Sequence, residues 1–103
     1  MIENLPKSIR VGPVNYEVTE VEGLHDKGEE LLGWVTYSDA LIRLDSESSE
    51  GRKKNVLIHE LVHAMLYEAG YDEQEEELVR RLSNVLTQVL RDNDFGFMRE
   101  DEE

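Results

Sequence analysis

The stretch Leu57-Ile58-His59-Glu60-Leu61-Val62-His63-Ala64-Met65 decides how this chain of 103 residues is interpreted. It lies inside residues 52–69, where apolar side chains recur three and four positions apart, and this spacing predicts an α-helix. Apolar residues cover most of the circumference of that helix, so we expect it to be central and buried. Gly70 follows directly and is a typical residue for ending a helix.

Two histidines four residues apart lie on the same side of a helix, so His59 and His63 can both reach one Zn²⁺ at about 2.0–2.1 Å. Glu60 lies about 100° around the helix from His59 and is placed to contact a metal-bound water. Two ligands and a general base on one helix are the HExxH arrangement of zinc proteases. Two histidines and a carboxylate also suit iron, and two plain surface histidines are the simplest alternative. The chain has no cysteine, which excludes thiolate ligands.

A catalytic zinc requires a third protein ligand. A second helix is predicted over residues 73–92, antiparallel to the first, with Asp72 as its cap and acidic residues in its first turn. We expect Leu82 at the centre of its buried stripe. With Leu82 inward, Glu75 points nearly inward and Glu76 lies at the edge of the stripe, so both are candidate ligands.

The front half of the chain carries the β signals. Residues 8–21 predict two strands around the Gly12-Pro13 turn, and residues 33–45 predict a second hairpin. We therefore expect an α+β fold in which a small antiparallel β-sheet, built from hairpins in residues 8–45, packs on two long antiparallel helices. A single domain should span residues 1–103, with a flexible polar tail at about 94–103.

The net charge of -13 disfavours binding to nucleic acid, because phosphates would be repelled. No segment approaches the roughly 20 apolar residues of a membrane span, and the first residues lack the features of a signal peptide. We expect a cytoplasmic protein that binds neither nucleic acid nor membrane. Its acidic surface serves solubility first, and it also suits a basic partner or mimicry of DNA.

The chain resembles the small gluzincin-like metallopeptidases of bacteria and phages, namely the ImmA/IrrE-type metallo-endopeptidases and the single-domain minigluzincins. The resemblance rests on residues 58–64 and on the spacing of Glu76, Val79, Leu82 and Ser83, and it covers about residues 30–92. It implies a zincin-like fold in which His59, His63 and Glu76 hold zinc. Glu60 would then be the catalytic general base.

The same resemblance implies a protein or peptide substrate, such as a regulatory protein, that pairs in extended form with the strand around Ile42, Arg43 and Leu44. Larger relatives use a separate Tyr or His to stabilise the oxyanion. The candidates for that role in this chain are Tyr37, Tyr67, Tyr71 and His25. The alternative function is a catalytically weak or inactive domain of this fold that acts as an acidic protein-binding module.

Overall fold

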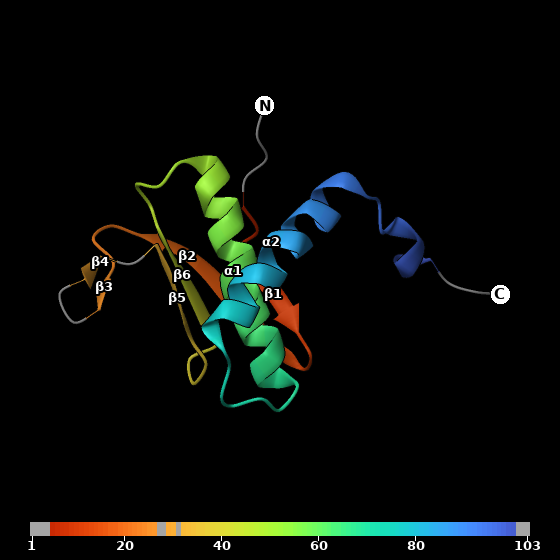
Figure 1. Cartoon of the computed structure of the whole chain (residues 1–103), viewed down its shortest axis with the longest axis horizontal. Coiled ribbons are helices and arrows are strands. Elements are labelled where there is room, and N and C mark those ends of the chain that lie inside the picture. The colour runs from red at the N-terminus through yellow and green to blue at the C-terminus, as the bar shows by residue number, and fades with distance from the viewer. Residues whose placement is uncertain (1–4, 27–28, 31, 101–103) are drawn as a thin grey trace.

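Two β-hairpins form a four-stranded sheet in the computed structural model, and two helices stack on one face of it (Figure 1). The structure describes residues 5–26, 29–30 and 32–100, with the backbone alone for 25–26 and 29–30. The sheet has the order β1-β2-β6-β5, and β3 and β4 form a separate two-stranded ribbon. The strands are β1 (Ser8–Val11), β2 (Val14–Val21), β3 (His25–Asp26), β4 (Glu29–Glu30), β5 (Gly33–Thr36) and β6 (Leu41–Asp45).

Both predicted hairpins are present, but they join in a way that makes the sheet mixed. β1 pairs antiparallel with β2, across a turn in which Gly12 takes a φ of 58°, and β5 pairs antiparallel with β6. β2 and β6 run parallel, with Val18 opposite Ile42. The prediction of an antiparallel sheet is therefore wrong at the junction of the hairpins. β6 lies in the middle because Ile42 and Leu44, both fully buried, need strands on either side to exclude water.

Helix α1 (Glu50–Glu68) covers this sheet and supplies the other half of the core. Ser49 caps its N-terminus by accepting a hydrogen bond from the Arg52 backbone N–H, at 3.2 Å. At the other end the Tyr16 hydroxyl donates to a Glu68 carboxylate oxygen at 2.6 Å, which ties β2 to the last turn. The buried core cluster comprises Val11, Tyr16, Val35, Ile42, Leu44, Leu57 and Ala64.

Helix α2 (Glu76–Asp92) packs on α1 and, among the described residues, contacts no strand. The layers are therefore sheet, α1 and α2, and the sheet does not pack on both helices. α2 begins three residues later than predicted, and Asp72 does not cap it. The N-cap position is held by Glu75, which makes no side-chain capping bond.

The predicted tail includes a short 3₁₀ turn, η1 (Gly96–Arg99). In the described part of the chain, neither helix is long and apolar enough to cross a membrane.

The buried stripe of α2 also differs from the prediction. Val79 and Ser83 are its buried residues, whereas Leu82 is 47% exposed. The centre of the buried face is thus rotated by roughly 80° from Leu82. An apolar side of α2 consequently faces solvent.

Strand β5 approaches α1 closely at Gly33. A Cβ atom at this position would lie 2.4 Å from Val56 Cγ1 and 3.3 Å from Glu60 Cγ. The first of these distances is far inside van der Waals contact, so a side chain at position 33 would push β5 and α1 apart. Only glycine, which has no Cβ atom, fits at position 33 without moving β5 or α1.

We expect Gly33→Ala to lower the free energy of unfolding by about 1–3 kcal/mol, because it overpacks the contact between sheet and helix. Val56→Ala removes the clashing methyl group, so Gly33→Ala should cost less in that background. Urea denaturation of the four proteins in this cycle measures the coupling. Gly51→Ala is the matched control, since its new Cβ meets nothing within 4 Å and should be neutral or stabilising. A Gly33→Ala cost that is the same with and without Val56 would contradict the steric argument.

Candidate metal centre

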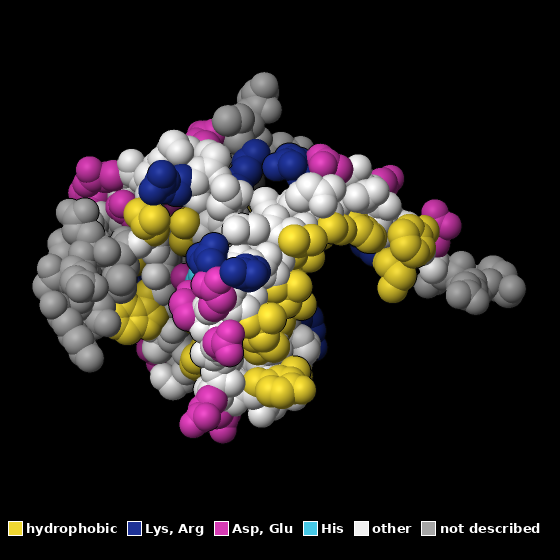
Figure 2. Space-filling view, in the orientation of Figure 1, with side chains coloured by type: hydrophobic (Ala, Val, Ile, Leu, Met, Phe, Trp, Pro, Cys, Tyr) yellow, Lys and Arg dark blue, Asp and Glu magenta, His cyan; other side chains and the backbone are white. Residues whose placement is uncertain are grey.

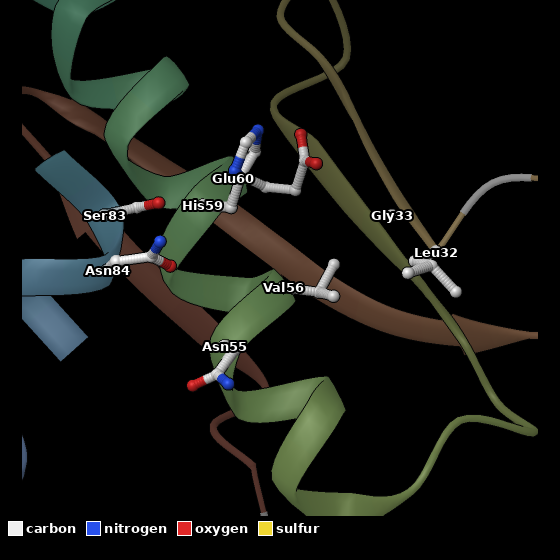
Figure 3. A pocket seen from close by; sticks show the side chains of 8 residues that line it. All are labelled: Leu32, Gly33, Asn55, Val56, His59, Glu60, Ser83 and Asn84. Carbon is white, nitrogen blue, oxygen red and sulfur yellow. The ribbon is translucent and has the colours of Figure 1, made fainter. Parts of the chain in front are cut away.

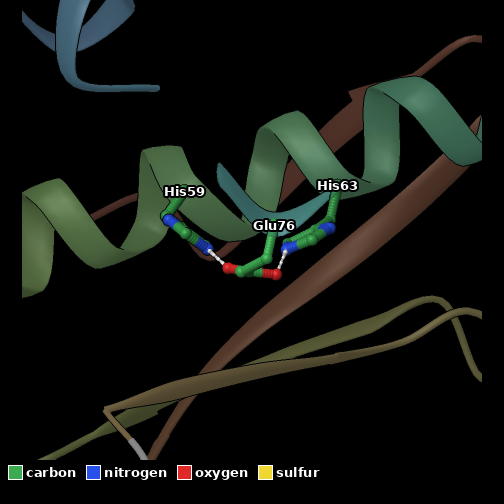
Figure 4. Close-up of side chains that lie close together, drawn as sticks. All are labelled: His59, His63 and Glu76. Carbon is green, nitrogen blue, oxygen red and sulfur yellow. Dashed lines mark hydrogen bonds and ion pairs between the residues drawn. The ribbon is translucent and has the colours of Figure 1, made fainter. Parts of the chain in front are cut away.

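Helix α1 presents both motif histidines on the side turned toward α2, and the first residue of α2 meets them there (Figure 4). The Glu76 carboxylate contacts His59 Nε2 at 2.6 Å through Oε1 and His63 Nε2 at 3.1 Å through Oε2. The potential ligand atoms of the three residues all lie within 4.8 Å of one another. Two elements from opposite sides of one interface thus bring two imidazoles and one carboxylate together.

This donor set fits a zinc ion. Bonds of about 2 Å in tetrahedral geometry place donors roughly 3.3 Å apart, so small side-chain movements suffice. The side chains of His59, His63 and Glu76 are 23%, 14% and 67% exposed, so solvent reaches the cluster from one side. Three protein ligands with an accessible fourth position are the pattern of a catalytic zinc site rather than a structural one.

The helix start explains why Glu76 and not Glu75 reaches the histidines. Glu75 has an extended backbone, with φ -80° and ψ 120°, and so stands outside the helical screw. The rotation of α2 that buries Val79 and Ser83 also turns Glu76 toward α1. Both effects depend on where the helix begins and on what it packs against.

Gln74 orients His63, a role that the sequence did not reveal. Its amide nitrogen donates to the Tyr71 carbonyl at 3.0 Å, which turns its Oε1 toward the ring. That oxygen lies 2.5 Å from His63 Nδ1 and can only accept, so Nδ1 carries the proton. In the neutral ring the lone pair is then on Nε2, facing Glu76. Hydrogen bonds of this kind fix the tautomer of metal-binding histidines.

Glu60 is the buried member of the motif, with 8% of its surface exposed. Burial raises the pKa of its carboxyl group to about 7; His63 opposes this shift and the negative charge of Glu76 adds to it. Such a carboxyl group exchanges a proton near neutral pH, which a general base must do.

A cavity of about 340 Å³ opens beside Glu60 and His59 (Figure 3). α1, α2 and the start of β5 all contribute to it, and Figure 3 shows the Glu60 side chain reaching from α1 toward the strands. The lining residues are Leu32, Gly33, Asn55, Val56, His59, Glu60, Ser83 and Asn84. The cavity therefore joins two motif residues to a mixed polar and apolar wall.

The prediction that Ile42, Arg43 and Leu44 pair with an extended substrate is wrong. β6 is hydrogen-bonded to β2 on one side and β5 on the other, so its backbone has no free edge. Ile42 and Leu44 are fully buried, and Arg43 donates to Thr36 Oγ1 at 2.9 Å. In the described part of the chain, the sheet edge nearest the cavity belongs to β5.

The backbone groups that β5 turns outward follow from its register. The Asp45 N–H donates to the Leu32 carbonyl at 2.9 Å, so this pair is a hydrogen-bonded one. Hydrogen-bonded and non-hydrogen-bonded pairs alternate along an antiparallel ladder, which makes Gly33–Leu44 and Val35–Ile42 non-hydrogen-bonded. The N–H and C=O groups of Gly33 and Val35 therefore point away from β6, toward the open edge.

One of the four oxyanion candidates lies beside the cluster. The Tyr37 hydroxyl is 3.3 Å from Gln74 Oε1, and its ring stacks on Tyr67 with centroids 4.1 Å apart. Burial raises the pKa of Tyr37, and the charges of Glu60 and Glu76 raise it further. Tyr71 is exposed, and the side chain of His25 lies outside the described residues.

Comparisons with known proteins add no relative: no family model matches the chain, and neither a curated protein nor a solved structure matches it.

The buried Glu60 carboxyl group should make the metal-free protein less stable as pH rises. Its folded pKa of about 7 lies above the ordinary 4.5, so the folded state holds the proton more tightly than the unfolded chain. Stability is then lost between about pH 4.5 and 7 and stays lost above that range. Glu60→Gln, which resembles the protonated form, should be roughly 3 kcal/mol more stable than wild type at pH 8 and nearly equal at pH 4.5. Thermal or urea unfolding in chelator across this range measures the difference.

Glu77→Gln is the control of opposite sign. Hydrogen bonds from Arg80 and Arg81 lower the pKa of the exposed Glu77. This stabilisation is present at neutral pH and is lost as the pH falls below the ordinary pKa, so Glu77→Gln should be slightly less stable than wild type at pH 8. A Glu60→Gln variant that gains nothing at pH 8 would show that the carboxylate is well solvated.

Proposed function

We propose that this protein is a zinc-dependent endopeptidase. The observation that carries the proposal is the meeting of Glu76 with both imidazoles, next to a buried carboxyl group and an open cavity. His59, His63 and Glu76 are the ligands, and Glu60 is the general base. The spacing of Glu76, Val79 and Ser83 behind the motif supports a gluzincin-like, zincin-related assignment, as does the ImmA/IrrE-like pattern of α1.

Each chain residue has a defined task in peptide hydrolysis. When bound, Zn²⁺ acidifies a water molecule and polarises the scissile carbonyl. Glu60 accepts a proton from the attacking water and delivers it to the leaving amine, and its place at the cavity beside His59 suits both transfers. Gln74 keeps the proton of His63 on Nδ1, so that Nε2 stays available as a ligand.

Tyr37 is the residue placed to stabilise the oxyanion. A raised pKa keeps its hydroxyl group protonated and able to donate. Its present acceptor, Gln74 Oε1, also accepts from His63, so the hydroxyl group can leave this longer bond for a developing negative charge. Stacking on Tyr67 holds the ring near the site during such a change.

The substrate is an extended segment of a protein or peptide added at the edge of β5. The outward N–H and C=O groups of Gly33 and Val35 supply the main-chain pairing. Gly33 also lines the cavity with Glu60 and His59, so a strand paired there runs directly past the reacting groups.

Gln74→Ala should weaken Zn²⁺ binding about 10–100-fold, because His63 loses the acceptor that fixes its tautomer. Competition with a chromophoric chelator measures the affinity. Glu73→Ala is the control: it removes an exposed side chain one residue away. Equal affinities for the two variants would remove Gln74 from the site.

The decisive test combines metal content with cleavage. Zinc should be stoichiometric in protein purified without chelator, and a mixed-sequence peptide library read by mass spectrometry should show cleavage. Glu60→Gln should retain zinc and lose about 10²–10⁴-fold in rate. Glu76→Gln should lose zinc, while its neighbour Glu75→Gln keeps both zinc and activity.

Two results would overturn the proposal. Absence of zinc from the purified protein would remove the cofactor. Cleavage that persists unchanged in Glu60→Gln would remove the mechanism. Zinc retention with no cleavage of any peptide would favour the alternative function, an acidic protein-binding domain of the same fold.

A further inference from the structure

The side of α2 that faces away from α1 is apolar and exposed. Leu78, Leu82 and Val85 are 53%, 47% and 59% exposed. Val89 lies on the same side of the helix and is half-buried. Figure 2 shows hydrophobic side chains in one yellow band along this helix, continuing to η1. Exposed apolar bands of this length on a small domain mark interaction surfaces.

The spacing of these four residues is that of a coiled-coil seam. Leu78, Leu82, Val85 and Val89 (the seam) follow one another at intervals of four, three and four, the a/d pattern of two heptads. The residues that face α1 are others, Val79 and Ser83. α2 is therefore built to pack on two sides, and the chain itself supplies a partner on one of them.

The shape of the molecule leaves the seam uncovered. α2 contacts only α1 among the described elements, and its C-terminal half extends away from the body (Figure 1). The radius of gyration is 14.3 Å, whereas a compact chain of this length has about 13 Å. The apolar side of a projecting amphipathic helix adds no stability while it stays in water, because it is not buried against a partner.

Charge singles out this segment as the place where two copies can meet. The chain has 24 acidic residues, yet residues 78–91 contain none of them and three arginines, Arg80, Arg81 and Arg91. These arginines are paired with acidic residues of the same helix, Arg80 and Arg81 with Glu77 and Arg91 with Asp92. Approach of a second copy along the seam therefore brings apolar side chains together without setting unpaired like charges against each other.

We propose that this chain forms a homodimer in which the seams of two α2 helices pack antiparallel. The antiparallel direction lets the projecting half of each helix cover the half that lies on the other body. It also keeps the two acidic bodies at opposite ends. Leu78 of one copy then lies near Val89 of the other, and Leu82 near Val85. The exposed Tyr71, Phe97 and Met98 extend the contact at its ends.

An acidic chain argues against the other use of such a helix, binding to a membrane surface. Basic amphipathic helices bind anionic lipid, but a net charge of -13 repels it. The dimer also leaves the cavity open, because Ser83 and Asn84 line it from the sides of α2 turned away from the seam.

Sedimentation equilibrium of the full chain, with and without chelator, tests association. Wild type should be dimeric within the range of about 1 µM to 1 mM. Val85→Glu should weaken dimerisation at least about 100-fold, because two unpaired carboxylates would be buried. Asn84→Glu is the matched control: it adds the same charge at the adjacent residue on another side of α2 and should remain dimeric.

A monomeric wild type throughout this range would overturn the proposal, as would a Val85→Glu variant that dimerises as well as Asn84→Glu. Binding of a monomeric wild type to phosphatidylglycerol vesicles would assign the seam to a lipid surface instead. Circular dichroism of each variant shows that a loss of dimer is not a loss of fold. Both tests can be carried out in chelator, so their outcome is separate from that of the zinc and cleavage experiments.

Disulfide trapping tests the direction, since the natural chain has no cysteine. A mixture of Leu78→Cys and Val89→Cys proteins should give disulfide-linked heterodimers under mild oxidation. Leu78→Cys alone should give few, because antiparallel packing separates the two copies of position 78. Efficient trapping of Leu78→Cys with itself would show parallel packing and overturn the antiparallel arrangement.

Discussion

The packing of α2 on α1 is the constraint that brings the Glu76 carboxylate to the two imidazoles. α2 touches no described strand, so only its contacts with α1 fix its rotation. The rotation that buries Val79 and Ser83 also turns Glu76 toward α1. The same rotation leaves Leu82 and the rest of the seam facing solvent.

Local signals were enough to predict the elements, and they failed where the answer depended on distant packing. Gly12 and Gly70 both take positive φ and mark the ends that the sequence indicated. The parallel pairing of β2 with β6 was missed, because either strand of a hairpin can join a neighbouring hairpin. Two short apolar runs, Gly33–Thr36 and Leu41–Asp45, look alike in sequence, and burial of Ile42 and Leu44 decides which is central.

The site was predictable to the extent that one helix determines it. The spacing of His59 and His63 is a property of α1 alone, so their common side was predicted correctly. The choice between Glu75 and Glu76 depended on where α2 begins and how it is rotated. Both are set by packing against α1, which the sequence of α2 alone does not reveal. Gln74 carries no motif, and its role arises only from the turn that brings it beside His63.

α2 links the two proposed properties of the molecule, because Glu76 and the seam lie on different sides of the same helix. A metal ion held by Glu76 would limit the movement of α2 from one side. A second copy on the seam would limit the same movement from the other. Once either event has restricted α2, the other has less conformational entropy to remove. Metal binding and dimerisation should therefore favour each other reciprocally. Among the described elements α2 packs on α1 alone, so both events act on the same contact.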